Sequence, residues 1–375
     1  MMLARQADRS LLGRWWWSID RWTLIALALL AAIGAILTMA AGPAAAQRVG
    51  LSPLHFVRHQ FMFLVPALFV LFGVSLLSPK SIRRIGVLGF LIGLGLVGLT
   101  VLLGNDVKGS SRWISLAGVT IQPSEFVKPC LAVTAAWVLS LAREKPEVPG
   151  RLIAAVLYVG VCGLLLLQPD FGMAVVVAAI GFVQFFLAGL PLIWVLVAVA
   201  FVIGGGFGAY TLLPHVAARI DGHFDPANSD TYQVDISMRA LQSGGLFGRG
   251  PGEGSVKNLL PDSHTDFVFA VAGEELGLLA CLGIVGLFGF VVLRGFSRAF
   301  KDTSLFVMLA VSGLLTQFGL QALINMGVTM RLLPAKGMTL PLISYGGSSL
   351  IATALAMGMV LALTRERPAA WKGLA

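Results

Sequence analysis

Charged residues are scarce in this sequence: Asp, Glu, Lys and Arg make up 12% of its 375 residues. A soluble domain carries roughly 25%, because charged side chains cover much of its water-facing surface. Hydrophobic residues make up 57% and occur in runs from one end of the chain to the other. The shortage of charge therefore argues against a water-soluble protein and favours one continuous membrane domain.

Cysteine is also rare, and its positions exclude several functions. Cys130, Cys162 and Cys281 each lie inside an apolar run without a CxxC pair, so buried thiols are expected rather than disulfides or a metal site. The sequence contains no HExxH or GxSxG motif, which argues against a zinc protease or a serine hydrolase.

Ten apolar runs are long enough to cross a bilayer, since a span needs roughly 20 residues that each rise 1.5 Å. We therefore predict an all-α integral membrane protein of about ten transmembrane helices. If the short breaks at 168–170 and 189–191 are kinks, the number falls to nine. The runs cover residues 22–41, 61–78, 84–104, 125–142, 152–168, 171–188, 190–210, 267–293, 303–328 and 344–364.

Basic residues are unevenly distributed between the predicted loops, and this sets the orientation. With ten helices and the N-terminus inside, 16 of the 27 Lys and Arg residues fall in or beside five short inside segments, which hold only 6 of the 18 acids. Positive residues favour the cytoplasmic side, so both termini are predicted to be cytoplasmic. Because the basic residues form short clusters, nucleic-acid binding is the weaker interpretation of the net charge.

The predicted parts are a cytoplasmic segment 1–21, a membrane domain 22–364 with a large outer loop 211–266 between helices 7 and 8, and a cytoplasmic tail 365–375.

The first apolar run allows two interpretations. Basic residues precede it, and Gly42-Pro43-Ala44-Ala45-Ala46 after it resembles a signal-peptidase site. The run of about 20 residues exceeds the 7–15 residues of a signal core. A retained first helix is therefore favoured, with a cleaved signal peptide as the alternative.

Two aspartates stand before the eighth run and include the candidate catalytic residue. Pro261 suits a first helical turn, so Asp262 and Asp266 are expected in the first two turns of that helix. A favourable interaction with the helix dipole explains Asp262. Asp266 abuts the apolar run, and an ionisable group at a membrane boundary is a functional candidate. Asp266 is therefore the candidate general base.

Glu274 and Glu275 follow on the same predicted helix, too far from Asp266 to form a close pair. On a regular helix Glu275 lies roughly 180° around and 13 Å along from Asp266, and Glu274 lies about 80° around and 12 Å along. A retaining mechanism needs two carboxyl groups about 5 Å apart, so it is not supported. Both acids are expected to pair with a cation or a hydrogen-bond donor from another helix.

Polar residues before the fourth run give further candidates. Ser124 is expected as a helix N-cap and Glu125 as a first-turn acid. Arg112, next to Trp113, reads most simply as an interfacial anchor. In the functional alternative, Arg112 and Lys128 face an anionic lipid headgroup.

Two glycine-rich stretches have irregular predicted backbone. Residues 331–349 contain two prolines and three glycines, and irregular backbone at membrane depth is tolerated only inside protein or around a wet cavity. Arg331 and Lys336 could bind phosphate there, or the segment is a rigid turn. Residues 244–254 lack the P-loop Lys-Ser/Thr pattern and are interpreted as flexible cover over a cavity.

Short motifs resemble the SEDS family, which comprises the FtsW, RodA and SpoVE proteins of bacterial division, elongation and sporulation. They occur in the family's order from about residue 20 to 365, and the set is specific although each motif is short. The motifs are Gly109-Ser110-Ser111-Arg112-Trp113 with Gln122-Pro123-Ser124-Glu125, Gln168-Pro169-Asp170-Phe171-Gly172, Tyr232-Gln233 with Gln242-Ser243-Gly244-Gly245-Leu246-Phe247-Gly248, His264-Thr265-Asp266-Phe267, and Ser344-Tyr345-Gly346-Gly347-Ser348-Ser349.

The resemblance implies a ten-span fold that polymerises lipid II into glycan strands at the outer face of the membrane. The family's essential acid falls on Asp266. An inverting displacement needs one general base, and cations must offset the charge on the leaving pyrophosphate. A divalent cation, Mg²⁺ or Mn²⁺, is the one cofactor considered. The candidate substrate-binding residues are Arg112, Lys128, Lys336, Arg331, Ser348, Ser349, Glu125 and His264.

The run from Lys336 to Leu342 resembles the FtsW, or division, branch more than the RodA branch. That branch implies the bacterial cytoplasmic membrane at the division septum, with a class B penicillin-binding protein and other divisome proteins as partners. The alternatives are a RodA-type elongation polymerase, a lipid II flippase, whose broken helices and buried charges would look similar, and a scaffold that only recruits division proteins.

Overall fold

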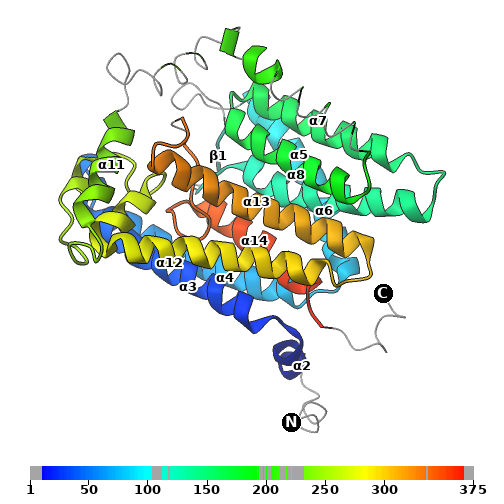
Figure 1. The fold of residues 1–375 in the computed structure, drawn as a ribbon, viewed down its shortest axis with the longest axis horizontal. Coiled ribbons are helices and arrows are strands. Elements are labelled where there is room, and N and C mark those ends of the chain that lie inside the picture. The colour runs from blue at the N-terminus through cyan, green and yellow to red at the C-terminus, as the bar shows by residue number, and fades with distance from the viewer. Residues whose placement is uncertain are drawn as a thin grey trace.

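The computed structural model shows a bundle of long helices (Figure 1). The helix α11 lies at one end of the bundle and α2 at the other. The structure describes residues 11–103, 112–116, 119–191, 193, 197, 200, 204–208, 210–211, 217, 221, 232–334 and 337–366.

Nine of the ten predicted spans correspond to a helix among these described residues, and the all-α prediction is confirmed. The predicted span 190–210 falls largely outside the described residues. Seven described helices are long and apolar enough to cross a membrane, and α8 and α14 are shorter apolar helices. The helices are α2 (Leu11–Ser18), α3 (Arg21–Arg48), α4 (His55–Ser75), α5 (Pro79–Leu103), α6 (Pro123–Glu144), α7 (Gly150–Leu167), α8 (Phe171–Leu187), α11 (Tyr232–Gly244), the 3-10 helix η2 (Val256–Leu259), α12 (Val268–Ala299), α13 (Leu305–Thr329) and α14 (Gly347–Leu363).

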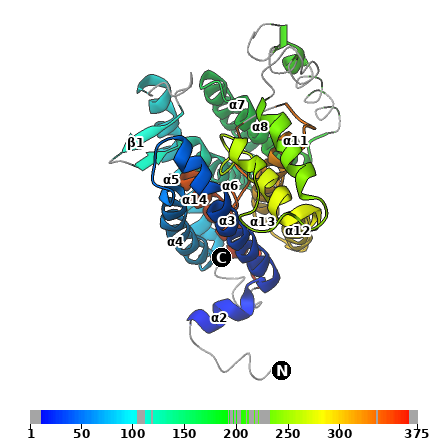
Figure 2. The same ribbon diagram turned by 90° about the vertical axis from the view of Figure 1, so that its left-hand side faces the viewer.

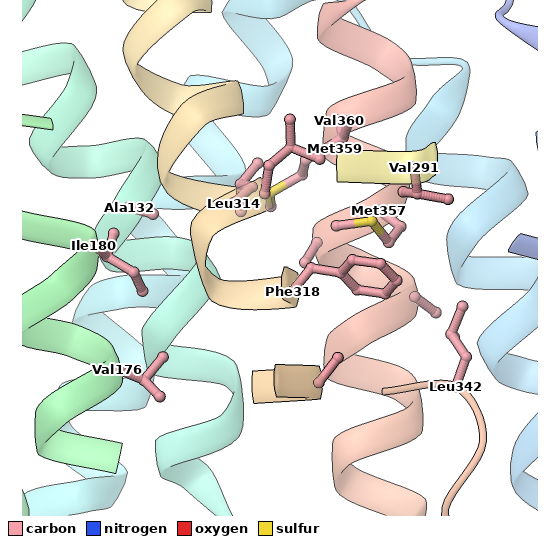
Figure 3. Close-up of a cluster of buried hydrophobic side chains, with 14 of the residues drawn as sticks. Ala132, Val176, Ile180, Val291, Leu314, Phe318, Leu342, Met357, Met359 and Val360 are labelled. Atoms are coloured by element: carbon pink, nitrogen blue, oxygen red, sulfur yellow. The ribbon is translucent and has the colours of Figure 1, made fainter. Parts of the chain in front are cut away.

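Two helices, α6 and α13, form the inside of the bundle. Most of each is buried, and α13 packs against α6, α8, α12 and α14. Figure 3 shows Leu314 and Phe318 of α13 between α8 and α14. Viewed from the α11 end, α4 and α5 lie on one side and α11 and α12 on the other (Figure 2). The outward faces of α4, α5 and α12 carry exposed large hydrophobic side chains, as lipid-facing helices do.

Both ends of the described chain meet at the α2 end of the bundle. The backbone N–H of Glu366 donates to the carbonyl of Ser18, and Arg365 Nε donates to Ser18 Oγ over 2.9 Å. Buried Asp20 accepts from Arg294 Nε over 2.7 Å and pairs with Arg298 at 2.9 Å. An even number of spans puts both termini on one side, so this arrangement agrees with the predicted topology.

The first predicted span is an integral part of the bundle. The helix α3 continues without a break through Pro43 to Arg48, and Ala45 and Ala46 are buried. It packs against α4 and α12. This packing supports a retained first helix over a cleaved signal peptide.

A short antiparallel hairpin, β1 (Ile114–Leu116) with β2 (Val119–Ile121), lies just before α6. This hairpin was not predicted from the sequence. The helix α6 then begins at Pro123 with Gln122 as its N-cap, so the N-cap prediction for Ser124 was wrong by two residues. Proline is favoured in the first turn because its missing N–H costs no hydrogen bond there.

The glycine-rich stretch 244–254 is docked on α12, so its interpretation as flexible cover was wrong. The helix α12 is broken at Gly277, where φ is 81°. The break leaves backbone groups without helical partners, and the loop supplies them. The N–H groups of Arg249 and Gly250 donate to the carbonyls of Glu274 and Glu275. In return, the N–H groups of residues 278 and 279 donate to the carbonyls of residues 245 and 246.

The side chains of the two buried glutamates complete this junction. Glu274 accepts from the backbone N–H groups of Val256 and Lys257, both over 2.7 Å. Glu275 forms a buried ion pair with the Lys257 ammonium. The prediction of a cation and hydrogen-bond donors is therefore confirmed, although they come from η2 in the outer loop rather than from another membrane helix.

Replacing Gly277 with alanine should lower stability sharply. The added Cβ would lie 2.3 Å from the backbone nitrogen of Gly248 and 2.5 Å from the carbonyl oxygen of Leu246. The positive φ alone costs about 1–3 kcal/mol for a residue other than glycine. We expect a lower apparent melting temperature of the purified protein in detergent, measured by tryptophan fluorescence. Gly283→Ala on the same helix is the control, because nothing lies within 4 Å of its added Cβ. Equal melting temperatures for both variants would contradict the docked loop.

Candidate active site

Asp266 lies in a series of turns before α12, which starts only at Val268. The prediction that Pro261 opens the helix was therefore wrong. The physical reason is that the backbone carbonyls of residues 264–266 accept hydrogen bonds from other segments instead of from a helical turn. Tyr345 N–H donates to the carbonyl of His264, and Ser344 Oγ donates to the carbonyl of Thr265. Asn325 Nδ2 donates to the carbonyl of Asp266 over 2.8 Å. Held this way, the Asp266 carboxylate lies outside helical geometry.

The helix α13 carries a buried polar stripe that organises the site. Its members, Gln317, Gln321, Asn325 and Thr329, recur every four residues, so they share one face of the helix. All four are buried. Asn325 Nδ2 also donates to the carbonyl of Met338, so a single amide ties the Asp266 turn and the 337–346 segment to α13.

A fully buried ion pair lies one helical turn further along this stripe. Glu125 and Lys128 of α6 meet at 2.9 Å, with side chains at most 3% exposed. Lys128 Nζ also donates to Gln321 Oε1 over 3.2 Å and lies 3.0 Å from Met173 Sδ. Because Gln321 and Asn325 are four residues apart, this pair and the Asp266 turn lie along one face of α13.

The two predicted serines join the same region. Ser349 shares a 2.7 Å hydrogen bond with Thr339, and Thr339 lies 3.5 Å from the Gln321 amide. Ser348 Oγ accepts from the backbone N–H of Gln122 over 3.1 Å. The start of α14 is thereby fixed to both the start of α6 and the 337–346 segment.

Gly337 lies directly beside the Asp266 carboxylate. A Cβ at Gly337 would lie 2.9 Å from Asp266 Oδ2, so only glycine leaves this side of the carboxylate uncrowded. The preceding residue, the predicted Lys336, lies outside the described residues.

His264 is buried between aromatic rings next to Asp266. Its ring stacks on Phe56 with centroids 4.2 Å apart and lies 5.4 Å from the ring of Tyr345. Burial lowers the pKa of His264 from 6.5 to about 4, although the nearby charge of Asp262 opposes the shift. The imidazole is therefore neutral at pH 7, so one ring nitrogen can donate a hydrogen bond and the other can accept one.

Several buried polar atoms around Asp266 have no hydrogen-bond partner within the described chain. They are His264 Nδ1, Ser263 Oγ and Asn325 Oδ1. Buried polar atoms are nearly always paired, by protein or by something bound. Ser263 and His264 belong to the same turns as Asp266, and Asn325 bonds to its backbone carbonyl. Unpaired polar atoms on these elements are what a site for a polar ligand requires.

Two of the predicted cations lie apart from this cluster. Arg112 pairs with Asp170 at 3.5 Å and donates to the carbonyl of Gln168 over 3.1 Å. Arg331 pairs with Asp235 of α11 at 3.2 Å. Both side chains stay about a quarter to a third exposed, so each guanidinium still has donors that reach the surface.

A protein cage for a metal ion is not found in the described part of the chain. Nowhere in it do three or more His, Cys, Asp or Glu residues gather at ligand distance. The divalent cation therefore stays a prediction.

Comparison with known proteins decides the family. The sequence model of the FtsW/RodA/SpoVE cell cycle proteins matches residues 20–369. This chain belongs to that family. A Caulobacter vibrioides relative, "Probable peptidoglycan glycosyltransferase FtsW", is 43% identical over 98% of this chain and 94% of its own length. A Coxiella burnetii relative of the same name is 37% identical over 93% and 97%. The predicted membership of the SEDS family is confirmed.

Solved structures show the same architecture. One, described as "Structural coordination of polymerization and crosslinking by a peptidoglycan synthase complex", superimposes with a TM-score of 0.77 at 30% identity, covering 92% of this chain and 97% of the other. The rod shape determining protein RodA of Thermus thermophilus gives a TM-score of 0.65 at 30% identity, covering 93% and 97%. Like these FtsW/RodA/SpoVE proteins, this chain is a multi-pass helical membrane protein.

Three residues of the site were missed from the sequence: Gln321, Asn325 and Gly337. A signal for the first two was present, because amides and hydroxyls every four residues in an apolar run mark one polar helix face. Gly337 had no such signal, since its proximity to Asp266 comes from two segments far apart in the chain.

The burial of His264 predicts an acid-sensitive fold. The pKa is about 4 in the folded protein and near 6.5 when unfolded, so the unfolded state binds the proton first as pH falls. Stability is therefore fully present above pH 6.5 and declines towards pH 4, by on the order of 3 kcal/mol. We expect His264→Phe, which keeps the aromatic stack, to flatten the apparent melting temperature between pH 7.5 and 4.5. An unchanged slope in that variant would assign the acid sensitivity to other groups.

Proposed function

We propose that this chain is a peptidoglycan glycosyltransferase that polymerises lipid II into β-1,4-linked glycan strands. One observation carries the proposal: the carboxylate of Asp266 lies outside α12 and beside Gly337, and the same turns carry buried polar atoms that have no partner within the described chain. The names of the Caulobacter and Coxiella relatives support the same activity. The FtsW, or division, branch is proposed because both of these relatives carry that name.

Asp266 would act as the general base of one inverting displacement. The donor sugar is α-linked to a lipid pyrophosphate and the product is β-linked, so a single in-line attack accounts for the stereochemistry. Asp266 takes the proton of the acceptor 4-hydroxyl as that oxygen attacks the donor anomeric carbon and the pyrophosphate leaves. Neutral His264, with an unbonded ring nitrogen, would orient the hydroxyl.

The cations divide into two roles under this proposal. Arg112 and Arg331 are partly exposed, so they are proposed to contact the lipid pyrophosphate, together with Lys336. Lys128 is fully buried against Glu125, so it acts as a positioning residue that holds α6, Gln321 and hence the Asp266 turn together. Ser348 and Ser349 fix the start of α14 in the same way.

The setting of the reaction follows from the topology. Asp266 precedes α12, and Asp20, Arg294 and Arg298 meet near its other end. We propose that the α11 end faces outward from the bacterial cytoplasmic membrane and that the segments 1–21 and 365–375 face the cytoplasm. The likeness to a peptidoglycan synthase complex supports a class B penicillin-binding protein, together with other divisome proteins at the septum, as partners.

Replacing Asp266 with asparagine should abolish polymerisation without unfolding the protein. General base catalysis contributes about 10²- to 10⁴-fold, and the amide keeps the size of the side chain. The assay is glycan formation from labelled lipid II by the protein co-purified with its transpeptidase. Asp262→Asn is the matched control, because Asp262 lies in the same turn and its carboxylate accepts one bond within the described chain, from Gln233 over 3.3 Å.

The outcomes separate the candidate functions. Polymer from the wild type and Asp262→Asn but not from Asp266→Asn supports the base assignment. Equal polymer from all three removes Asp266 as the base. No polymer from the wild type, combined with transfer of labelled lipid II across vesicle membranes, would replace the proposal with a flippase.

A methyl group at Gly337 should slow the same reaction. Gly337→Ala places its Cβ 2.9 Å from Asp266 Oδ2 and displaces the carboxylate, so we expect a loss of turnover of about tenfold or more with little change in melting temperature. Gly346→Ala is the control: its φ of 169° suits any residue, and its added Cβ makes ordinary contacts at 3.4 Å. Full activity of Gly337→Ala would mean that the carboxylate works in another position.

A further inference from the structure

A polar cavity opens at the α2 end of the bundle, remote from Asp266. It has a volume of about 960 Å³ and lies between the ends of α5, α6, α12, α13 and α14. That volume falls within the roughly 300–1,000 Å³ of ligand sites. The lining residues with charge or a hydroxyl group are Lys80, Arg83, Ser140, Glu144, Arg294, Ser297, Arg298, Lys301, Asp302, Thr303, Ser304, Thr364, Arg365 and Glu366.

The cavity wall carries more positive charge than its own carboxylates balance. Six cations line it against three acids, and Glu144, Asp302 and Glu366 are all exposed. The four arginines are only partly exposed. Asp20 behind the wall bonds to Arg294 and Arg298, which still leaves an excess of cations. Partly buried like charges repel one another, so an anion bound among them would stabilise the fold.

Two of these cations have nothing anionic to bind within the described chain. Arg83 makes cation–π contacts with Trp137 at 5.6 Å and Phe306 at 6.0 Å, and its N–H donors have no acceptor in the part of the chain that the structure describes. Among the described residues, the side chain of Lys301 has no ion pair or hydrogen bond. A guanidinium held in place with unused donors is suited to bidentate contact with phosphate.

The remaining lining residues offer the other donors that a phosphate needs. Thr303 and Ser304 lead into α13, a helix of 25 residues, whose first turn presents the positive end of the helix dipole. Asp302 and the Ser304 hydroxyl already accept from the N–H groups of Ser304 and Val307, so the dipole contributes here through its field. Ser297 adds a hydroxyl group from α12, whereas the hydroxyl of Ser140 on α6 already donates to the carbonyl of Trp137. Cations, hydroxyl groups and a helix N-terminus therefore converge from separate elements on one cavity.

We propose that this cavity is a binding site for a phosphate group at the cytoplasmic end of the bundle. Its position at the ends of membrane helices puts it at the depth of lipid headgroups, and basic pockets between such helices bind anionic headgroups. An anionic phospholipid of the inner leaflet is the favoured source of the phosphate, and a soluble phosphate is the other source. The site is separate from the proposed polymerase centre, and binding there is measured without polymerisation.

Native mass spectrometry of the full-length protein in detergent tests this site. The probes are phosphatidylglycerol, zwitterionic phosphatidylethanolamine and inorganic phosphate. We expect the wild type to retain phosphatidylglycerol selectively, and Arg83→Gln and Lys301→Gln to weaken binding by about fivefold each. Arg84→Gln is the matched control, because Arg84 neighbours Arg83 on α5 without lining the cavity. Lys301 is exposed, so Lys301→Gln tests the site even if Arg83→Gln fails to fold.

Each outcome of this experiment either supports or overturns the proposed phosphate site. Retention of phosphatidylglycerol that falls in both cavity variants and not in Arg84→Gln supports the site with a lipid ligand. Stabilisation of the wild type by millimolar inorganic phosphate, with the same dependence on the variants, supports it with a soluble ligand. Equal effects of all three variants, or binding that none of them changes, would overturn the proposal.

Discussion

The hydrogen bonds between two non-helical segments hold the proposed polymerase centre together. Inside a bilayer a backbone group without a protein partner is costly, so irregular chain survives there only when another segment satisfies it. The carbonyls of residues 264–266 obtain donors from Ser344, Tyr345 and Asn325. The chain is thereby held out of helical structure at Asp266, so that its carboxylate lies beside Gly337. The stripe on α13 makes this arrangement rigid.

Much of the fold was predictable because a segment that crosses lipid must be apolar and must satisfy its backbone hydrogen bonds within itself. Apolar runs of about 20 residues have to be helices, so nine described helices match predicted spans. The local detail was not predictable. Pro261 favours a helical start, but three tertiary hydrogen bonds to the carbonyls of residues 264–266 override that preference. The loop 244–254 was predicted to be flexible because its glycines allow many backbone conformations. The sequence does not reveal the break in α12 at Gly277 whose backbone groups bond to this loop. Asp266 stood out from its position, whereas Gly337 acquires meaning only through a contact between distant segments.

The buried charges show how the bundle uses ion pairs at different depths. Glu125 with Lys128 is fully enclosed beside the proposed centre, and Glu275 with Lys257 joins the outer loop to α12. Asp20 joins α3 to the other end of α12. Breaking one partner of such a pair leaves an unpaired buried charge, so these pairs specify the register of the helices more than they add net stability.

The docking of residues 244–254 onto α12 is made by backbone atoms on both sides. Contacts of this kind do not involve the side chains of the loop. The side chains of Leu246 and Phe247 are accordingly 57% and 79% exposed. The joint therefore excludes side chains at Gly244, Gly248 and Gly277, where an added Cβ would lie within 2.3 Å of a backbone atom. The exposed Leu246 and Phe247 are carried on this fixed backbone, so the joint sets where two apolar side chains lie on the outer end of the bundle.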